Sequence, residues 1–566
     1  MPCRILLRRL RLLPSPKPKG HAPARLLRRH GQLARPQLPF LSTPLANSNQ
    51  FRYLTTERKR WLAYEVYLGF KWTLYFWAII GCSVVAYWSV QEEWLERNFP
   101  TPHEWRFMTR LRLRRAKWNP ERADLPEPDW VTTGNFLKVV LEKLEDRSGD
   151  GAGVEDLAEG GVWIDGSARS GYDITAKSEP WRRGYYEALM LSAKVAEHLD
   201  AHVADMTRQL VFPATMVIGP SNPKPQPIPF GIDKPPLEED CVRAYEEPDT
   251  FYRRILTTEG FSPKQRMDAA LAYANWLDFK NVPETAEKMY ELALSLSSEN
   301  VAPADVPYDA KSYVLRADGA RPPSANIFTA LTAMATHKAR SEDLSTALPI
   351  LLSILRARRS LPETPPPRAG LAPPEPEKPS RSPWTLDNIV GTARRLVAPP
   401  DYPAPPDDGE APPARDARER CEEAALDLYI GEIIYAGRGR EDGLAWTREA
   451  VDLAEEQLHR LGPDDDDDAA RKTCRECLGS GLENWAKMVG RLAREERERE
   501  DAAAAAAAAG AGSWFGALWG SEGRREATTG RWAAEENVVR ERTRRAQEVL
   551  DELEAPSTPF RSIFAA

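Results

Sequence analysis

The chain has 566 residues, with 77 Lys and Arg, 84 Asp and Glu, and six cysteines. Residues 1–56 hold 11 of the basic residues and no acidic one, so the remainder is acidic, with 66 basic against 84 acidic side chains. This acidic balance disfavours nucleic acid as the main partner, because binding to phosphates needs a basic surface. Six cysteines in so long a chain also exclude a disulfide framework as the basis of the fold.

Residues 1–53 have the composition of a mitochondrial presequence. They lack acids and are rich in Arg, Leu, Pro and Ser, and their first turns can form a short basic amphipathic helix. A secretory signal would need an unbroken apolar core of about 7–15 residues, and none is present. A disordered basic arm is the alternative. We therefore expect a cleaved presequence, with the cut near Arg52 and Tyr53.

Residues 72–90 predict one transmembrane helix, because they carry no charge. At about 1.5 Å per residue they reach roughly 28 Å, close to the thickness of the hydrocarbon core. Aromatic residues, which favour lipid–water boundaries, stand at both ends: Trp72, Tyr75, Trp77, Tyr87, Trp88 and Trp94. A buried core helix is the alternative, but a soluble helix usually keeps one polar face.

The charges around this span predict its orientation. Residues 54–71 form a basic tail, and acidic residues follow the span at positions 92, 93 and 96. The positive-inside rule then places the amino terminus in the mitochondrial matrix and the carboxy-terminal domain in the intermembrane space, as a single-pass inner-membrane protein. Residues 91–130 form a juxtamembrane basic amphipathic segment. It could lie on an anionic membrane surface or pack on the soluble domain, and the sequence leaves both interpretations open.

Residues 131–566 read as an all-α domain of helices and loops. One spacing, of 12 and then seven positions between mostly small residues, occurs three times: at Ala274, Ala286 and Ala293; at Ala335, Ala347 and Ile354; and at Gly431, Gly443 and Ala450. Two antiparallel helices cross closely where both present a small side chain, so the spacing predicts three helical hairpins. The offsets resemble the tetratricopeptide repeat consensus, and the predicted fold is an irregular tetratricopeptide-like array. A generic helical bundle is the alternative.

Loops rich in proline or of low complexity separate the predicted helices, because proline cannot continue a helix. These loops lie at about 299–323, 361–415 and 501–530, and we expect them to be disordered. Further helices are expected outside the hairpins, at 136–144, 181–210, 471–500 and 531–553. The first two would cap the amino-terminal end of the array, and the last two would form a carboxy-terminal hairpin around a poly-Ala insert.

No catalytic signature occurs: the zinc-protease motif, the phosphate-binding loop and the nucleophile elbow are all missing from the sequence. Cys474 and Cys477 form the only Cys-x-x-Cys pair, and no second pair completes a zinc site. The pair lies in a helical pattern, so we expect two small buried structural residues, with a redox switch as the alternative. We predict a non-enzymatic protein without catalytic residues, metal or cofactor; an enzyme of unrecognised type is the alternative.

What remains is a binding surface. In helical repeats the inner faces of the first helices line a groove that takes extended peptides or partner helices. The consensus register predicts twelve groove residues: Asp268, Leu271, Asn275, Asp278, Phe279, Thr329, Thr332, Thr336, Arg340, Leu428, Glu432 and Tyr435. Their mixture of polar and apolar side chains suits unfolded or flexible client polypeptides. For each of them, a capped or solvated residue is the alternative.

The order of presequence, basic tail, aromatic-bounded span, basic juxtamembrane segment and irregular repeats resembles the adaptor subunit of the mitochondrial inner-membrane i-AAA protease supercomplex of fungi. The resemblance covers most of the chain from about residue 51. It implies that the chain binds misfolded or unassembled membrane and intermembrane-space proteins and delivers them to the ATP-dependent protease. It also implies the i-AAA protease and a companion adaptor subunit as partners. An assembly or import factor of the same membrane is the alternative function.

Overall fold

The computed structural model describes residues 56–122, 127–157, 171–228, 234–303, 305–316, 322–363, 402–437, 439–461, 468–510 and 530–554. The chain divides into two compact units, Met1–Val85 and Ala86–Ala566. The expected presequence, residues 1–53, lies outside the described residues, as do the parts of the expected loops at 317–321, 364–401 and 511–529.

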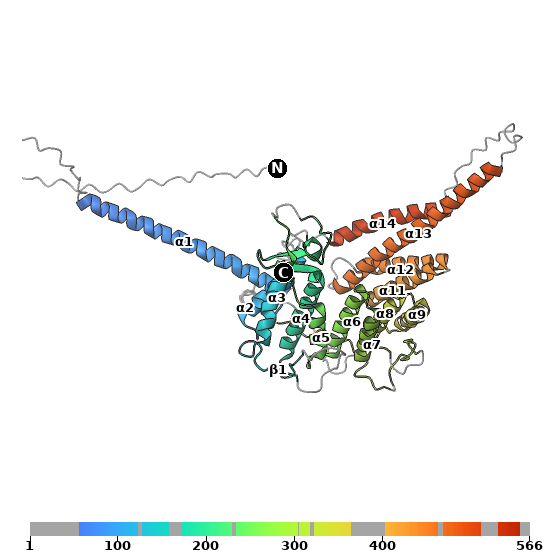
Figure 1. Cartoon of the computed structure of the whole chain (residues 1–566), viewed down its shortest axis with the longest axis horizontal. Coiled ribbons are helices and arrows are strands. Elements are labelled where there is room, and N and C mark those ends of the chain that lie inside the picture. The colour runs from blue at the N-terminus through green and yellow to red at the C-terminus, as the bar shows by residue number, and fades with distance from the viewer. Residues whose placement is uncertain are drawn as a thin grey trace, which may run out of the picture. The chain divides into compact units, whose positions relative to one another are not determined.

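Helix α1 (Thr56–Asn98) contains the expected transmembrane span (Figure 1). It is 43 residues long, so the span and most of the basic tail before it form one continuous helix. Among the described residues it is the one helix that is long and apolar enough to cross a membrane, and none of its most apolar window is buried inside the protein. Its length and composition are compatible with a single-pass membrane protein.

The basic segment after the span forms α2 (Phe107–Trp118), and its arginines pair with carboxylates at the end of α1. Arg114 is 2% exposed and lies 2.9 Å from Glu96, while Arg115 lies 2.9 Å from Glu92. Burial lowers the pKa of Arg114, although Glu96 opposes this effect. Because these cations are already paired within the protein, the structure favours packing on the soluble domain over a membrane-surface contact.

Three further helices, α3 (Trp130–Glu145), α4 (Glu179–Leu199) and α5 (Pro248–Thr257), pack one on the next. A short 3-10 helix, η1 (Asn119–Glu121), leads from α2 into α3. Side-chain caps start the helices, because Asp129 accepts the backbone N–H of Thr132 and Ser178 accepts that of Trp181. The inward faces of the helices join a continuous apolar core that extends into the later hairpins.

The described residues are mostly helical, as expected, and two small sheets of short strands interrupt the helices. Strands β1 (Glu155–Asp156) and β2 (Tyr172–Asp173) form an antiparallel pair. Strands β3 (His202–Asp205), β4 (Leu210–Pro213) and β5 (Cys241–Arg243) form an antiparallel sheet in the order β4-β3-β5. Short 3-10 helices, η2 (Ala214–Met216) and η3 (Glu238–Asp240), flank this sheet in the chain.

The helix predicted over 181–210 therefore ends earlier, at Leu199. A tight turn follows β3, in which Asp205 accepts the N–H of Thr207 and Gln209 takes a positive φ of 57°. This turn lets Val203 pair with Phe212 across the sheet. The β-branched residues of the segment fit a pleated strand better than a helix.

Three helical hairpins follow, each with a connection of three residues between its helices (Figure 1). They are α6 (Pro263–Phe279) with α7 (Pro283–Ser297), α8 (Ala325–Arg340) with α9 (Leu344–Arg359), and α11 (Ala417–Ala436) with α12 (Arg440–Arg460). Two of the connections contain a residue in the left-handed region, Asn281 and Glu342. Neighbouring hairpins also pack together, α7 on α8 and α9 on α11.

Small residues mark the close crossings within these hairpins. Ala274 and Ala286 are fully buried in the packed pair α6 and α7, as are Ala335 and Ala347 in α8 and α9. A Cβ atom built on Gly443 of α12 would lie 2.6 Å from the backbone oxygen of Gly431 on α11. The third crossing is therefore so close that only glycine fits there.

The last two helices of the described residues are α13 (Asp468–Gly510) and α14 (Arg531–Glu554), which pack against each other (Figure 1). Helix α13 also packs on α11 and α12. The expected carboxy-terminal hairpin is confirmed, but α13 continues through the poly-Ala run that we placed in a loop. Alanine has the highest helix propensity of all residues, so the run extends the helix instead of ending it.

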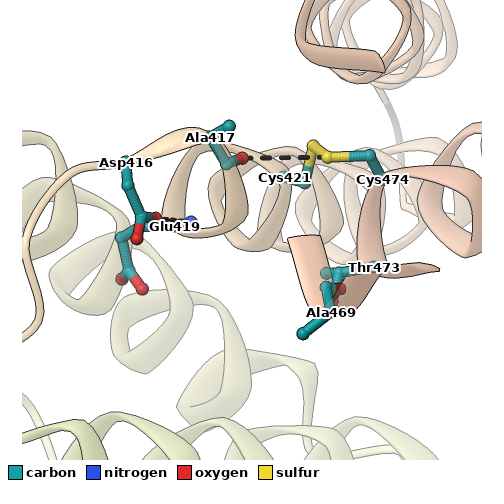
Figure 2. Close-up of a disulfide and its surroundings, with 7 residues drawn as sticks. All are labelled: Asp416, Ala417, Glu419, Cys421, Ala469, Thr473 and Cys474. Atoms are coloured by element: carbon teal, nitrogen blue, oxygen red, sulfur yellow. Dashed lines mark hydrogen bonds between the residues drawn. A yellow bond between two sulfur atoms is a disulfide. The ribbon is translucent and has the colours of Figure 1, made fainter. Parts of the chain in front are cut away.

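A disulfide between Cys421 and Cys474 joins α11 to α13, with the two Cα atoms 5.1 Å apart (Figure 2). Cys474 and Cys477 are both buried, as expected, but the sequence pattern did not predict that Cys474 forms a disulfide. Cys477 alone is a buried free thiol, and burial raises its pKa to about 12. The reason is tertiary: the partner of Cys474 lies 53 residues earlier in the chain, on a different helix.

Two of the expected disordered loops are partly ordered. In the first, Tyr308 and Leu315 are buried in the apolar core, and the N–H of Leu315 donates to Ser353 Oγ at 3.1 Å. In the second, residues 402–415 form no helix but make hydrogen bonds to α4, α6 and α8. We call residues 402–415 the strap.

Candidate peptide-binding surface

A cavity of about 790 Å³ lies between α4 and α6, the first of the hairpin helices. Its lining combines aromatic and aliphatic side chains with polar ones, and it includes Met190, His198, Trp276 and Phe279. Phe279 is 73% exposed, and its ring stacks on Trp276 with centroids 5.5 Å apart. A large exposed aromatic ring beside a cavity is a feature of surfaces that bind apolar side chains of other molecules.

Beside this cavity, a partly buried polar network ties three helices together. The hydroxyl of Tyr290 on α7 lies 2.9 Å from Asn275 Oδ1 and 3.0 Å from Asp278 Oδ2, both on α6. His337 on α8 is 2% exposed, and its Nδ1 lies 2.9 Å from Asp278 Oδ1. Because Asp278 is occupied by these partners, it holds the helices together and does not face a ligand.

A smaller cavity of about 370 Å³ lies between α8, α9 and α11. Thr336 and Arg340 of α8 line one side, and Glu432 of α11 lines the other together with Tyr429. Burial raises the pKa of Glu432, while its hydrogen bond from Asn484 opposes that effect. The cavity combines one cation, one carboxylate and an aromatic ring, so it can accept a polar peptide segment.

A third cavity of about 770 Å³ lies beside the strap and is charged. Arg182 and Arg183 of α4, Lys264 and Asp268 of α6, and Asp407 of the strap line it. Burial raises the pKa of Asp268, and Lys264 opposes the shift.

Six of the twelve predicted groove residues line these three cavities: Asp268, Asn275, Phe279, Thr336, Arg340 and Glu432. Three others are buried, which contradicts a role on an open groove: Leu271, Leu428 and Tyr435. The hydroxyl of Tyr435 donates to the carbonyl of Met488 on α13, which covers this part of α11. The hydroxyls of Thr329 and Thr332 donate hydrogen bonds to backbone carbonyls of their own helix. Asp278 belongs to the network described above.

The sequence-based prediction missed the α4 side of the first cavity. Tyr186, Met190 and His198 line it, but α4 had been assigned only a capping role. The spacing of these residues, four and eight positions apart, is the signal that places them on one helical face. The strap was missed as well, because its contacts with α4 and α6 join residues more than 140 positions apart.

The described residues contain no group of three or more His, Cys, Asp or Glu side chains that could hold a metal ion. No protein-family model matches this chain, and no curated protein matches it.

Proposed function

We propose that this chain is a membrane-anchored, non-enzymatic adaptor that binds unfolded or unassembled polypeptides and delivers them to the mitochondrial inner-membrane i-AAA protease. The observation that carries the proposal is the cavity between α4 and α6, whose lining combines the exposed ring of Phe279 with polar side chains. Such a mixture suits an extended chain, because an apolar side chain can enter the cavity while backbone groups meet polar partners.

The arrangement of the helices supports the interpretation of the hairpins as a tetratricopeptide-like array. Three consecutive hairpins follow the same spacing of mostly small residues. Each hairpin buries these residues within its packed pair of helices. In arrays of this kind the first helices of neighbouring hairpins line a continuous surface for a peptide. The cavities at α4 and α6 and at α8 and α11 follow that order.

The location that we propose is the inner membrane, with the carboxy-terminal domain in the intermembrane space. The acid-free first 56 residues and the apolar window of α1 support this location. The disulfide between Cys421 and Cys474 supports it as well, because disulfides persist in oxidising compartments and are rare in reducing ones.

A binding measurement tests the first half of the proposal. The full chain in detergent is titrated with a reduced and alkylated model polypeptide that cannot fold, and Phe279→Ala is compared with Phe107→Ala. Phe107 is 58% exposed on α2 and lines none of the cavities described above, so it is a matched control. We expect Phe279→Ala to weaken binding about tenfold or more, because burying a Phe side chain contributes roughly 1.5–3 kcal/mol. Equal affinities for both variants would contradict polypeptide binding at the cavity between α4 and α6.

Affinity capture from mildly solubilised mitochondria tests the second half. An adaptor brings down an ATP-dependent inner-membrane protease, and loss of the chain leaves misfolded clients undegraded. Recovery of no such protease would overturn the adaptor role even if the polypeptide-binding result stands. Accumulation of an unassembled respiratory subunit instead of undegraded clients would indicate an assembly factor.

A further inference from the structure

The strap contacts the amino-terminal parts of three helices, α4 and the first helices of two successive hairpins, α6 and α8. Arg183 stands in the second turn of α4, Lys264 in the first turn of α6, and Asn326 in the first turn of α8. Each of these three residues bonds the strap, and the contact points advance along the strap in the same order as the helices advance along the array. One segment of the chain therefore lies across several repeats, as a bound peptide does.

The three helices hold the strap almost entirely by its backbone carbonyl groups. The guanidinium of Arg183 donates to the carbonyls of Pro403 at 2.6 Å and Ala404 at 2.9 Å. Lys264 Nζ donates to the carbonyl of Asp407 at 2.6 Å. These donors meet atoms that every peptide has, so the contacts do not depend on which side chains the bound segment carries.

The contact with α8 has the same character. The side-chain amide of Asn326 donates to the carbonyl of Asp408 at 2.8 Å, and its backbone N–H lies 3.2 Å from the carbonyl of Gly409. The backbone N–H of Ala325 lies 3.3 Å from the carbonyl of Ala411. Backbone N–H groups in the first turn of a helix have no partner within the helix, so they are free to bind a segment from outside.

Side chains of the strap add a preference for a particular composition. The ring of Tyr402 lies 4.3 Å from the guanidinium of Arg183, a cation–π contact. Pro403, Pro405 and Pro406 lack a backbone N–H, so these three positions have no backbone donor that needs an acceptor. The carboxylate of Glu410 accepts a hydrogen bond from Asn300. An extended segment with prolines, an aromatic residue and acids fits the site.

We propose that the amino-terminal ends of α4, α6 and α8 form a binding site for an extended, proline-containing acidic segment of a second polypeptide, and that the strap occupies this site in cis. The charged cavity of about 770 Å³ beside the strap supports exchange, because the occupant leaves part of its site open. The inference rests on the proposed function in that the second polypeptide is a client or companion of an adaptor.

A tethered occupant competes with any ligand in trans. A segment that is linked to its own site acts at an effective concentration of order millimolar, so it lowers the apparent affinity for an outside peptide. Weakening the strap then strengthens binding in trans, while weakening the site abolishes both. These opposite effects separate a competing occupant from a structural loop.

The test uses the full chain in detergent and a fluorescein-labelled peptide of residues 402–415. The released variant carries Tyr402→Ala, Pro405→Gly and Pro406→Gly, which remove the cation–π contact and two rigid residues. We expect the peptide to bind the released variant at least tenfold more tightly than the unmodified chain. In the released background, Lys264→Gln should weaken binding several-fold, while Lys288→Gln on α7 should leave it unchanged.

Equal affinity for the unmodified and released chains would overturn the inference, as would binding that is insensitive to Lys264→Gln. Lys264 is partly exposed and lies in the first turn of α6, so its substitution spares the core. Measuring the unfolded model polypeptide in parallel separates the two proposals. Loss of the peptide response with an intact Phe279→Ala effect would refute only the strap site, and the reverse result would refute only the groove.

Discussion

Replacement of Gly443 by Ala tests the close crossing of α11 and α12. A Cβ atom at this position would lie 2.5 Å from the backbone nitrogen of Tyr435 and 2.6 Å from the backbone oxygen of Gly431. Carbon atoms do not approach backbone atoms below about 3 Å, and backbone atoms inside a helix cannot rotate away. The two helices must therefore move apart, which opens gaps along their whole contact.

We expect Gly443→Ala to lower the free energy of unfolding by about 2 kcal/mol in total. Overpacking costs about 1–3 kcal/mol, and the rigid backbone on the α11 side puts this crossing near the upper end. The higher helix propensity of alanine relative to glycine offsets roughly 1 kcal/mol of this destabilisation. Gly479→Ala on α13 is the matched control, since a Cβ atom there meets nothing within 4 Å. The free energy of unfolding of Gly479→Ala should be higher than that of the unmodified chain by up to about 1 kcal/mol.

Amide hydrogen exchange, read by mass spectrometry on the full chain in detergent, measures the effect locally. A loss of about 2 kcal/mol corresponds to roughly 30-fold faster exchange in peptides from α11 and α12. Gly479→Ala should leave these peptides unchanged and slow exchange in α13. If Gly443→Ala slows exchange in α11 and α12, the helices are not in close contact and the reasoning fails.

Two further predictions concern the third hairpin. Replacing Cys421 and Cys474 by Ser should lower the free energy of unfolding by up to about 4 kcal/mol, because the disulfide closes a loop of 53 residues; a urea midpoint that stays unchanged would contradict this. Burial raises the pKa of Asp427 to about 7, against the opposing effect of Arg359. Because the folded-state pKa exceeds the ordinary value of 3.8, the contribution of Asp427 to stability is full below about pH 4 and is lost as the pH rises through 7. Asp427→Asn should therefore gain in thermal stability over the unmodified chain between pH 5 and pH 8, and a difference independent of pH would refute it.

The sequence predicts local features of this fold well. Apolar spacing and small residues place the hairpins, and the last helix begins at the predicted position, Arg531. Features that need distant partners are not predicted. Helix α4 ends at Leu199 because the next segment pairs with β5, about 40 residues later. The disulfide of Cys474 and the strap depend on contacts of the same non-local kind.

Some predicted groove residues line a cavity and others are buried, for a similar reason. A repeat register assigns a residue to one face of a helix, and Asn275 and Phe279 do line a cavity. The register does not say what else covers that face. Tyr435 and Leu428 lie on α11, which α13 covers, so they are buried among helices that the repeat pattern does not include. Burial by neighbours outside the repeat separates the residues that face a cavity from those that do not.

The disulfide between α11 and α13 also determines how the chain responds to mechanical tension. When a chain is pulled from both ends, the force passes from residue 421 to residue 474 through the covalent bond, so the residues between them carry no load. An extended chain spans about 3.5 Å per residue, and roughly 180 Å of contour length therefore stays protected. A protein that is held by a membrane at one end and drawn by a translocating motor at the other would keep this hairpin intact.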